Sequence, residues 1–203
     1  EWGGSKGGVV IDPSKCSNQE LKNVTESLVD EMDERNLLGP FRDVPAPDVG
    51  TNPQIMNWIR QRYAQRRRSR EDARFAGVVT GKPVGYGFGG IPGRISATGF
   101  GLTKVLDRII YLKHLSRSNL NRVAVMGFGN VGYHVAKFLA EDNYKIVAIG
   151  DVHGGVYRKD GISLFEILNA KTTGDFSKVD KISNAELLEL NDVDILVPAA
   201  LEN

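Results

Sequence analysis

RVAVMGFGNVGYHVAKFLAEDNYKIVAIGD, residues 122–151, is the stretch that most strongly constrains the fold of this chain. The apolar run RVAVM at its start is typical of a strand buried on both faces, and apolar residues then recur at helical spacing. Three glycines separate the two patterns. Gly127 permits a sharp turn, Gly129 lets backbone N–H groups approach a pyrophosphate, and Gly132 lets the helix pack closely on the strand. The pattern predicts a strand, a tight turn and a helix whose positive end faces a phosphate.

A second apolar run follows this helix and ends in a carboxylate. The strand expected over Lys145–Gly150 leads into Asp151, about twenty residues past the turn, where a carboxylate can accept hydrogen bonds from a ribose. Together these features favour a dinucleotide-binding half-domain, with Asp151 among its cofactor-binding residues. Glycine-rich strand–helix turns also bind S-adenosylmethionine or sugar nucleotides, and some need small residues only for packing.

The rest of the chain extends this pattern in both directions. After Asp151 come a turn at 154–157, the segment Gly161–Leu168, a short helix Asn184–Leu190 and a strand Asp194–Pro198. This alternation predicts an α/β fold with a Rossmann-type, doubly wound parallel sheet. The glycine-rich residues 85–101 suggest a hinge. We therefore expect two domains: residues 1–88, part of an α/β substrate domain, and residues 89–203, part of the dinucleotide-binding domain.

Composition places the chain among ordinary globular proteins and excludes several specialised classes. It has 203 residues, 41% of them hydrophobic and 25% charged, with a formal net charge of +1. That charge argues against a dedicated nucleic-acid binder, and no apolar run is long enough to cross a membrane. The single Cys16 excludes an internal disulfide framework and fits a reducing, cytoplasmic setting. Both ends look interrupted, so we expect a fragment of a longer polypeptide.

Two stretches before the hinge carry residues suited to proton chemistry. GGSKGG sets Lys6 between two glycine pairs, where an amine held away from water would have a lowered pKa and could act as a base or polarise a carbonyl. DVPAPDVGTN holds Asp48 beside two prolines, which makes it a candidate proton-transfer group. The alternative readings are a solvated lysine in a flexible turn and an Asx-turn aspartate before the helix that starts near Pro53.

Other polar features favour plainer interpretations. Ser17 or Asn18 caps a helix whose acids Asp30, Glu31, Asp33 and Glu34 we read as solvated. The arginine run from Arg66 to Arg70 could bind phosphate, although a solvated helix end or a subunit-contact loop explains it better. Thr98 either caps a helix or directs its hydroxyl into a cleft. The histidines lack metal-ligand spacing, so no metal site is expected.

Taken together, these stretches resemble the glutamate dehydrogenase family within the wider group of amino-acid dehydrogenases. The matching motifs occur in family order over nearly the whole chain: GGSKGG (3–8), DVPAPDVGTN (43–52), MNWIRQRY (56–63), TGKP (80–83), GRISATGFG (93–101), GFGNVG (127–132) and DILVPAALEN (194–203). The DVPAPD wording favours glutamate over the relatives that act on leucine, valine or phenylalanine. Those sister enzymes and a catalytically silent, nucleotide-binding regulatory paralogue remain the alternatives.

The resemblance implies a reaction and its site residues. The reaction is the reversible oxidative deamination of L-glutamate to 2-oxoglutarate and ammonia, with hydride transfer from Cα to nicotinamide. It further implies that Lys6 is the catalytic lysine and Asp48 the proton shuttle, that Thr98 and Asn130 touch the nicotinamide cofactor, and that the three glycines lie under its pyrophosphate. The cofactor is NAD or NADP. The negative charge of Asp151 disfavours the 2′-phosphate of NADP, but His153 nearby could offset that charge, so both cofactors are considered.

The family also implies features of the whole enzyme. Closure of a cleft between the two domains would bring hydride donor and acceptor together and exclude water. A homo-oligomer, a hexamer in the full-length enzyme, is expected, with small-molecule substrates and with neither nucleic acid nor membrane as a partner. The family's substrate-carboxylate lysines lie before residue 1 and a contacting serine lies after Asn203. The 203-residue chain alone is therefore expected to be inactive.

Overall fold

The computed structural model describes residues 4–67, 73–85, 87, 89–116, 119–174, 176 and 180–200. The chain divides into two compact units, unit 1 spanning Glu1–Arg94 and unit 2 spanning Ile95–Asn203. The boundary expected from the sequence, after residue 88, stays a prediction about where the domains of the family meet. Each unit has its own apolar core, so the two are described separately.

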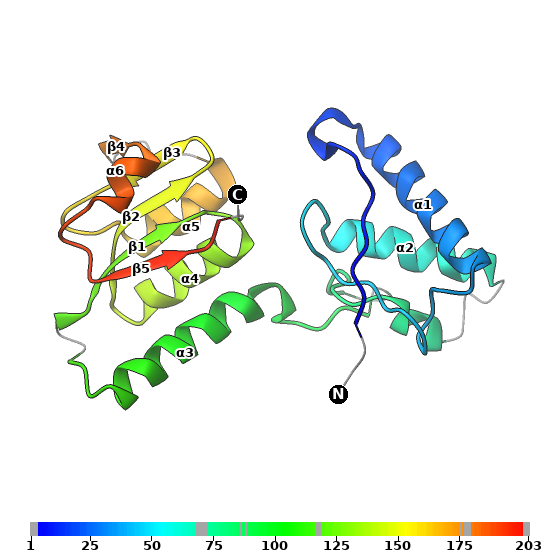
Figure 1. The fold of residues 1–203 in the computed structure, drawn as a ribbon, viewed down its shortest axis with the longest axis horizontal. Coiled ribbons are helices and arrows are strands. Elements are labelled where there is room, and N and C mark those ends of the chain that lie inside the picture. Colours follow the sequence, from blue (N-terminus) through cyan, green and yellow to red (C-terminus); the bar gives the residue numbers. More distant parts are fainter. Residues whose placement is uncertain are drawn as a thin grey trace. The chain divides into compact units, whose positions relative to one another are not determined.

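Unit 1 is built on two packed helices, α1 (Asn18–Glu34) and α2 (Pro53–Arg66), shown in blue and cyan in Figure 1. Short 3-10 helices lie at Pro13–Lys15 (η1), Ala73–Val78 (η2) and, at the junction with unit 2, Arg94–Ser96 (η3). Among the described residues of this unit, β pairing is limited to an isolated bridge between Leu38 and Asp43. The described part of unit 1 is therefore mainly helical.

The helix starts in unit 1 follow the sequence. Ser17 and Glu20 form a reciprocal capping box at the start of α1, and the Asn52 side chain accepts a hydrogen bond from the Ile55 N–H at the start of α2. The buried residues of α1 are Thr25 and Val29. Thr25 tolerates burial because its hydroxyl donates to the Leu21 carbonyl, 2.7 Å away.

The core of unit 1 fills the space between α1, α2 and the segment after η2. Its buried members come from α1, the loop after it, α2, and the end of η2 with the residue that follows: Val29, Leu38, Ile55, Met56, Trp58, Ile59, Tyr63, Val78 and Val79. Val78 and Val79 are 0% and 1% exposed, so the segment leading into Thr80 is anchored from its first residues. This anchoring positions the TGKP motif.

Unit 2 contains a five-stranded sheet in the order β4-β3-β2-β1-β5. Its strands are β1 (Arg122–Met126), β2 (Lys145–Asp151), β3 (Gly154–Tyr157), β4 (Asp180–Ile182) and β5 (Ile195–Pro198). The strands β2, β1 and β5 are parallel, as predicted, whereas β3 is antiparallel to both of its neighbours, β2 and β4. The mixed α/β fold is confirmed, and the parallel part of the sheet carries the glycine turn.

The turn expected at residues 154–157 is wrong, because these residues form strand β3. Gly155 suggested a turn, yet a Cβ there would lie 3.3 Å from both Ile182 Cγ1 and Leu187 Cδ1. The glycine therefore serves the close packing of β3 against its neighbours. Local sequence could not distinguish this use of glycine from a turn.

Helices cover both faces of the sheet in unit 2 (Figure 1). The helices of this unit are α3 (Ala97–Leu112), α4 (Asn130–Glu141), α5 (Leu164–Thr173) and α6 (Asn184–Leu188), and α3 packs on α4. The alternation along β1 divides the core, because Val123 and Val125 pack with α4 and α5 while Ala124 packs with Leu187 of α6. Both α5 and α6 begin with Ser–Glu capping boxes. Layers on two sides of the sheet agree with the doubly wound expectation.

Candidate functional site

The loop that carries Asp48 is supported by the TGKP segment. The Thr80 N–H donates to the Pro45 carbonyl over 2.9 Å. Gly81 has a φ of +61°, and a Cβ there would lie 2.3 Å from Pro47 Cγ, so glycine is needed for this contact. Two prolines and this packing fix the loop in unit 1.

Within the loop, Asp48 uses its two carboxylate oxygens differently. Oδ1 accepts the Val49 N–H at 2.8 Å, and the Asp48 N–H itself donates to the Thr51 hydroxyl at 2.7 Å. Oδ2 contacts the ammonium of Lys6. The turn interpretation and the functional interpretation of Asp48 are therefore compatible, because one oxygen serves the backbone and the other remains for chemistry.

Lys6 and Asp48, the two residues predicted for proton chemistry, are in direct contact although they are 42 positions apart. A hydrogen bond from Lys6, the Val49 N–H and the positive charge of Lys6 together lower the pKa of Asp48, which keeps this carboxylate ionised at neutral pH. The side chains are 86% and 55% exposed. Unit 1 therefore does not hold the Lys6 amine away from water, which was the condition for the expected lowering of its pKa.

A second contact joins the same two motifs, and sequence reasoning missed it. The Ser5 hydroxyl donates to Asp43 Oδ2 over 2.9 Å. Ser5 precedes Lys6, and Asp43 opens the DVPAPDVGTN motif, so the motifs are joined at two points. The sequence placed Ser5 and Asp43 in two motifs already selected as functional, but the spacing of these motifs does not indicate which of their residues pair.

In unit 2, two glycines of the turn are required by the protein's own backbone. Gly127 has a φ of +103°, and a Cβ there would lie 2.5 Å from the Ala199 carbonyl oxygen. A Cβ at Gly132 would lie 1.8 Å from the Gly127 carbonyl oxygen. Larger side chains are excluded at both positions by main-chain atoms, which cannot move aside as a flexible side chain would.

Gly129 differs from its two neighbours. Its φ is −74°, and a Cβ there would meet no protein atom within 4 Å. Packing within the protein therefore does not explain this glycine, whereas the close approach of a ligand to the N-terminus of α4 would. The residues present thus fit a pyrophosphate at this turn.

The other predicted cofactor residues lie around this turn or at the end of β2. The Asn130 side-chain amide donates to the Ile95 carbonyl over 2.8 Å, which ties the start of α4 to the segment before α3. Thr98 is exposed in the first turn of α3; the N-cap is Ser96, so the interpretation of Thr98 as the cap is wrong. Asp151 ends β2, and its Oδ1 accepts the His153 N–H at 2.7 Å.

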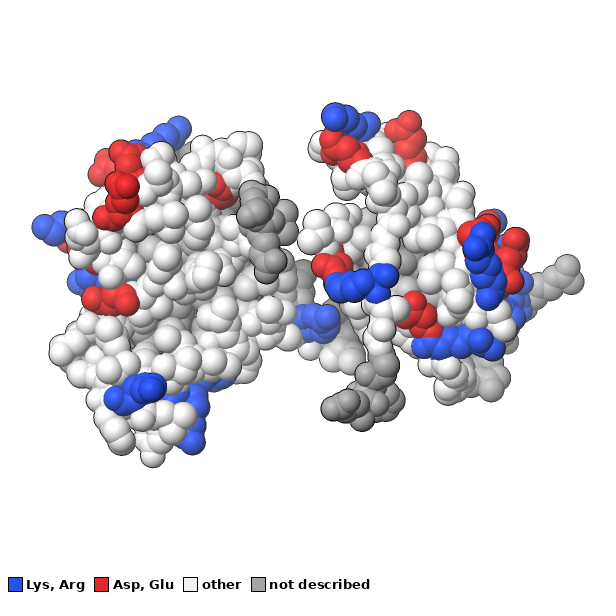
Figure 2. Space-filling view, in the orientation of Figure 1, with Lys and Arg blue, Asp and Glu red and all other residues white. Residues whose placement is uncertain are grey.

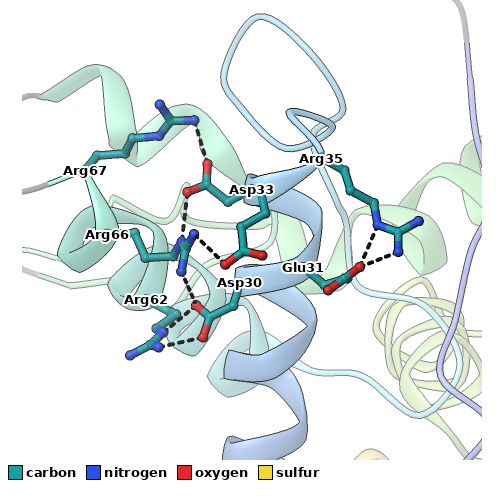
Figure 3. A network of polar contacts seen from close by, with 8 residues as sticks. Asp30, Glu31, Asp33, Arg35, Arg62, Arg66 and Arg67 are labelled. Carbon is teal, nitrogen blue, oxygen red and sulfur yellow. Dashed lines mark hydrogen bonds and ion pairs between the residues drawn. The ribbon is translucent and has the colours of Figure 1, made fainter.

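A network of ion pairs joins α1 to the end of α2 (Figure 3). Arg62 forms two hydrogen bonds with Asp30, at 2.7 and 2.6 Å. Asp33 contacts both Arg66 and Arg67, and its side chain is only 8% exposed. The expectation that Asp30 and Asp33 are solvated is therefore wrong; the cause is the facing arginines, which lie more than thirty positions away.

This network also bears on the arginine run. Arg66 and Arg67 are neutralised by acids of α1, which leaves them less able to attract a polyanion. On the face of unit 1 shown in Figure 2, basic and acidic side chains lie next to one another. Residues 68–72, the rest of the run, lie outside the described residues.

Among the residues that the structure describes, no group of His, Cys, Asp and Glu is arranged to hold a metal ion, and no helix is long and apolar enough to cross a membrane.

Comparison with known proteins is consistent over the whole chain. Residues 89–203 match the family model described as Glutamate/Leucine/Phenylalanine/Valine dehydrogenase, and residues 1–65 match the dimerisation domain of the same family. A glutamate dehydrogenase of Aeropyrum pernix is 43% identical over 99% of this chain and 47% of its own length. An NADP-specific glutamate dehydrogenase of Synechocystis is 39% identical over 100% of this chain and 48% of its own length.

Solved structures agree with these relatives. A hetero-hexameric glutamate dehydrogenase from Thermus thermophilus, in a leucine-bound form, superposes with a TM-score of 0.82 and 33% identity, covering 94% of this chain and 43% of that one. Glutamate dehydrogenase from Peptoniphilus asaccharolyticus gives a TM-score of 0.64 and 34% identity, over 95% of this chain and 44% of that one. The chain spans about half the length of the curated relatives it matches.

Proposed function

The chain belongs to the Glutamate/Leucine/Phenylalanine/Valine dehydrogenase family, and from that premise we propose that the protein catalyses the reversible NAD(P)-dependent oxidative deamination of L-glutamate to 2-oxoglutarate and ammonia. The contact between Lys6 and Asp48 is the observation that carries the proposal, because it unites the two motifs that sequence analysis singled out for proton transfer. The relatives at about 40% identity are named glutamate dehydrogenases, which supports glutamate as the substrate.

Lys6 and Asp48 divide the proton chemistry in this proposal. Asp48, ionised because its pKa is lowered, takes a proton from the substrate amino group and returns one to departing ammonia. Lys6 stabilises negative charge that develops on oxygen as water adds to the carbon that bore the amine. The nicotinamide, when bound, supplies the hydride acceptor. Substrate binding must also exclude water around this exposed pair, because the pair is solvated in unit 1 alone.

The turn at residues 127–132 is the proposed cofactor site. Gly127 and Gly132 shape it, Gly129 leaves room for the pyrophosphate, and Asn130 and Thr98 would lie toward the nicotinamide. Asp151 would accept hydrogen bonds from the adenosine ribose and disfavours a 2′-phosphate by charge repulsion. Relatives include enzymes named NAD-specific and NADP-specific, so NAD and NADP are both proposed as cofactors.

Assembly and location follow the family. A homo-hexamer is proposed because residues 1–65 match the family's dimerisation domain and a structural relative is named hetero-hexameric. A cytoplasmic setting is proposed from the single cysteine of the chain.

A chimera would test the reaction. Residues 1–203 replace the matching segment of the Aeropyrum pernix enzyme, so that the other half of the length is supplied by a glutamate dehydrogenase. The chimera should reduce NAD or NADP with L-glutamate, and Lys6→Ala or Asp48→Asn should each lower kcat on the order of 10²-fold or more while NADH binding is retained.

Other outcomes would move the assignment. Turnover with leucine, valine or phenylalanine but not glutamate would transfer the protein to the sister enzymes. A folded chimera that binds NADH but is inactive with every amino acid, with or without the Lys6 replacement, would support a silent regulatory paralogue. Equal activity of the Lys6→Ala chimera and its unmodified form would refute the role of the Lys6–Asp48 pair.

A further inference from the structure

One arginine of α2 differs from the arginines that face α1. The Nε of Arg60 is buried and has no hydrogen-bond partner. Its Nη2 makes a long hydrogen bond, 3.3 Å, to the side-chain oxygen of Asn57, which is itself only 4% exposed. Arg62 and Arg66 on the same helix pair with acids of α1. Arg60 is therefore a partly buried cation whose donors are poorly used.

Lys82 of the TGKP motif lies in the electrostatic range of Arg60. Its ammonium contacts the carbonyl of the buried residue Val79, and its Cε would lie 3.6 Å from a Cβ built on Gly89. Burial lowers the pKa of Lys82, and the positive charge of Arg60 lowers it further. Val79 belongs to the same buried cluster as Ile59, which precedes Arg60 on α2, so two cations lie in one region of unit 1. Neither forms an ion pair with an acid of the described chain.

An arrangement of this kind is costly unless an anion completes it. A buried donor without a partner loses its hydrogen bonds to water and gains none from the protein, which costs free energy. Two like charges also repel more strongly where solvent is excluded. The guanidinium presents neighbouring N–H groups that match two oxygens of a phosphate or carboxylate, while a lysine ammonium adds a point charge. An oxyanion would supply a partner for both groups.

We propose that Arg60 and Lys82 form a binding site for an oxyanion, a phosphate or a carboxylate, in unit 1. Neither residue belongs to the Lys6–Asp48 pair or to the glycine turn. Lys82 follows directly on Thr80 and Gly81, the residues that support the Asp48 loop. The site is independent of the dehydrogenase reaction, so its test requires no turnover.

Side-chain NMR of the 203-residue chain would test the site directly. The Arg60 Nε–Hε resonance, assigned by its loss in Arg60→Met, is followed while inorganic phosphate or acetate replaces chloride at constant ionic strength. The resonance should shift and saturate with phosphate. Lys82→Met should weaken this binding about ten-fold or more, because it removes one charge-assisted contact. Arg35→Met is the matched control, since Arg35 pairs with the exposed Glu31, and it should leave the affinity unchanged.

Thermal unfolding gives a second, independent readout. Trp58 is buried in unit 1 and its fluorescence follows this unit, with Trp2→Phe removing the other tryptophan. Phosphate at roughly ten times its dissociation constant should raise the Tm of unit 1 by about 6 °C or more. In chloride, Arg60→Met should be as stable as the unmodified chain or more so, because methionine keeps the apolar stem and removes an uncompensated charge.

Saturation with phosphate alone would define a phosphate site, and saturation with both anions a general oxyanion site; either supports the proposal. The proposal would be overturned if the Arg60 resonance did not shift with either anion. It would also be overturned if Arg60→Met lowered the Tm by the same amount in chloride and in phosphate. A resonance that responds to protein concentration and not to phosphate would also overturn it, because a second copy of the chain would then supply the carboxylate.

Discussion

The glycine turn of unit 2 and the Lys6–Asp48 pair of unit 1 hold their positions by different means. Gly127 and Gly132 are fixed by main-chain atoms that leave no room for a Cβ, and the strand β1 beneath them is buried. Lys6 and Asp48 are fixed by short loops and by each other, and both side chains are largely in water. Shape is thus built into the first region, while the second depends on charge that solvent can screen.

This difference predicts that stability and activity separate between the two regions. The turn should be intolerant of any added atom that meets the backbone, whether or not a ligand is present. The pair should contribute little to folding and acquire its importance only when substrate excludes water. Four measurements, from the largest expected effect to the smallest, would test that separation.

Gly132→Ala should have the largest effect on folding. The new Cβ would lie 1.8 Å from the Gly127 carbonyl oxygen, so the strand and helix α4 must move apart. We expect a loss of about 4 kcal/mol in the free energy of unfolding of unit 2, at the severe end of single substitutions. Denaturant unfolding followed by far-ultraviolet circular dichroism measures it.

Gly129→Ala is the matched control, because its Cβ meets no protein atom and its φ is ordinary for alanine. It should cost less than about 1 kcal/mol in the free energy of unfolding, because alanine is less favourable than glycine at the N-cap of α4, and it should weaken NADH binding, measured by the fluorescence of the dinucleotide. Equal destabilisation by the two alanines would show that the turn is not shaped by the contacts described here.

The sequence predicted this turn because its cause is local. The spacing of Gly127, Gly129 and Gly132 after an apolar strand has few structural solutions, and the structure adopts one of them. Strand β3 was missed because the packing of Ile182 and Leu187 on Gly155 comes from residues far along the chain. Glycine marks both a turn and a close contact, and only the tertiary structure distinguishes them.

The candidate site divides in the same way. Proline and glycine context was enough to select Lys6 and Asp48, but their contact and the neighbouring Ser5–Asp43 hydrogen bond depend on a chain path of about forty residues. For the same reason the partners of Asp33 could not be foreseen, since helical periodicity places an acid on a face of α1 and says nothing of the arginines that α2 brings to it. Pairwise charge contacts are the least predictable layer of this fold.

Asp33→Asn tests a shielded charge in the same unit as the exposed pair. Asp33 is 8% exposed and contacts Arg66 and Arg67, so its removal takes away the acid that Arg67 contacts and one of the three acids that Arg66 contacts. We expect a loss of about 2 kcal/mol in the free energy of unfolding of unit 1, below the value for a fully buried pair because both arginines retain some water. Trp58 fluorescence during urea unfolding measures it.

Glu31→Gln is the control for Asp33→Asn. Glu31 lies two residues earlier on the same helix, and it and its partner Arg35 are 56% and 70% exposed. Its replacement should not change the unfolding midpoint beyond error. If Glu31→Gln proved as harmful as Asp33→Asn, exposure would not be the property that separates strong from weak charge contacts in unit 1.

Glu166→Gln extends the comparison to a charge within a helix cap of unit 2. Hydrogen bonds from Arg158 and from the Ser163 side chain and N–H lower the pKa of Glu166 from 4.5 to about 2. A carboxyl whose pKa is lowered by folding stabilises the native state above its unfolded pKa, and this contribution disappears as pH falls through the folded pKa. The variant should be about 1 kcal/mol less stable at pH 7, with the difference falling between about pH 4.5 and 2.

Glu186→Gln separates the arginine contact from the capping box. Glu186 forms the same box with Ser183, and the pKa of Glu186 is lowered by Ser183 alone. Its replacement should cost less stability than Glu166→Gln at pH 7. A pH-independent loss in Glu166→Gln would instead assign the effect to helix geometry and not to ionisation.

The smallest effect is expected from the Lys6–Asp48 pair itself, in a double-mutant cycle of Lys6→Met and Asp48→Asn. The coupling in unfolding free energy should lie within experimental error, because both groups are exposed and an exposed ion pair gains little over hydrated ions. What remains should vanish in acid, since the lowered pKa of Asp48 stabilises the fold only above its unfolded value. The same cycle measured on kcat in the chimera should show strong coupling. A large coupling in stability with none in kcat would mean that the pair is a structural clasp between two loops, and the contrast between the two regions would not hold.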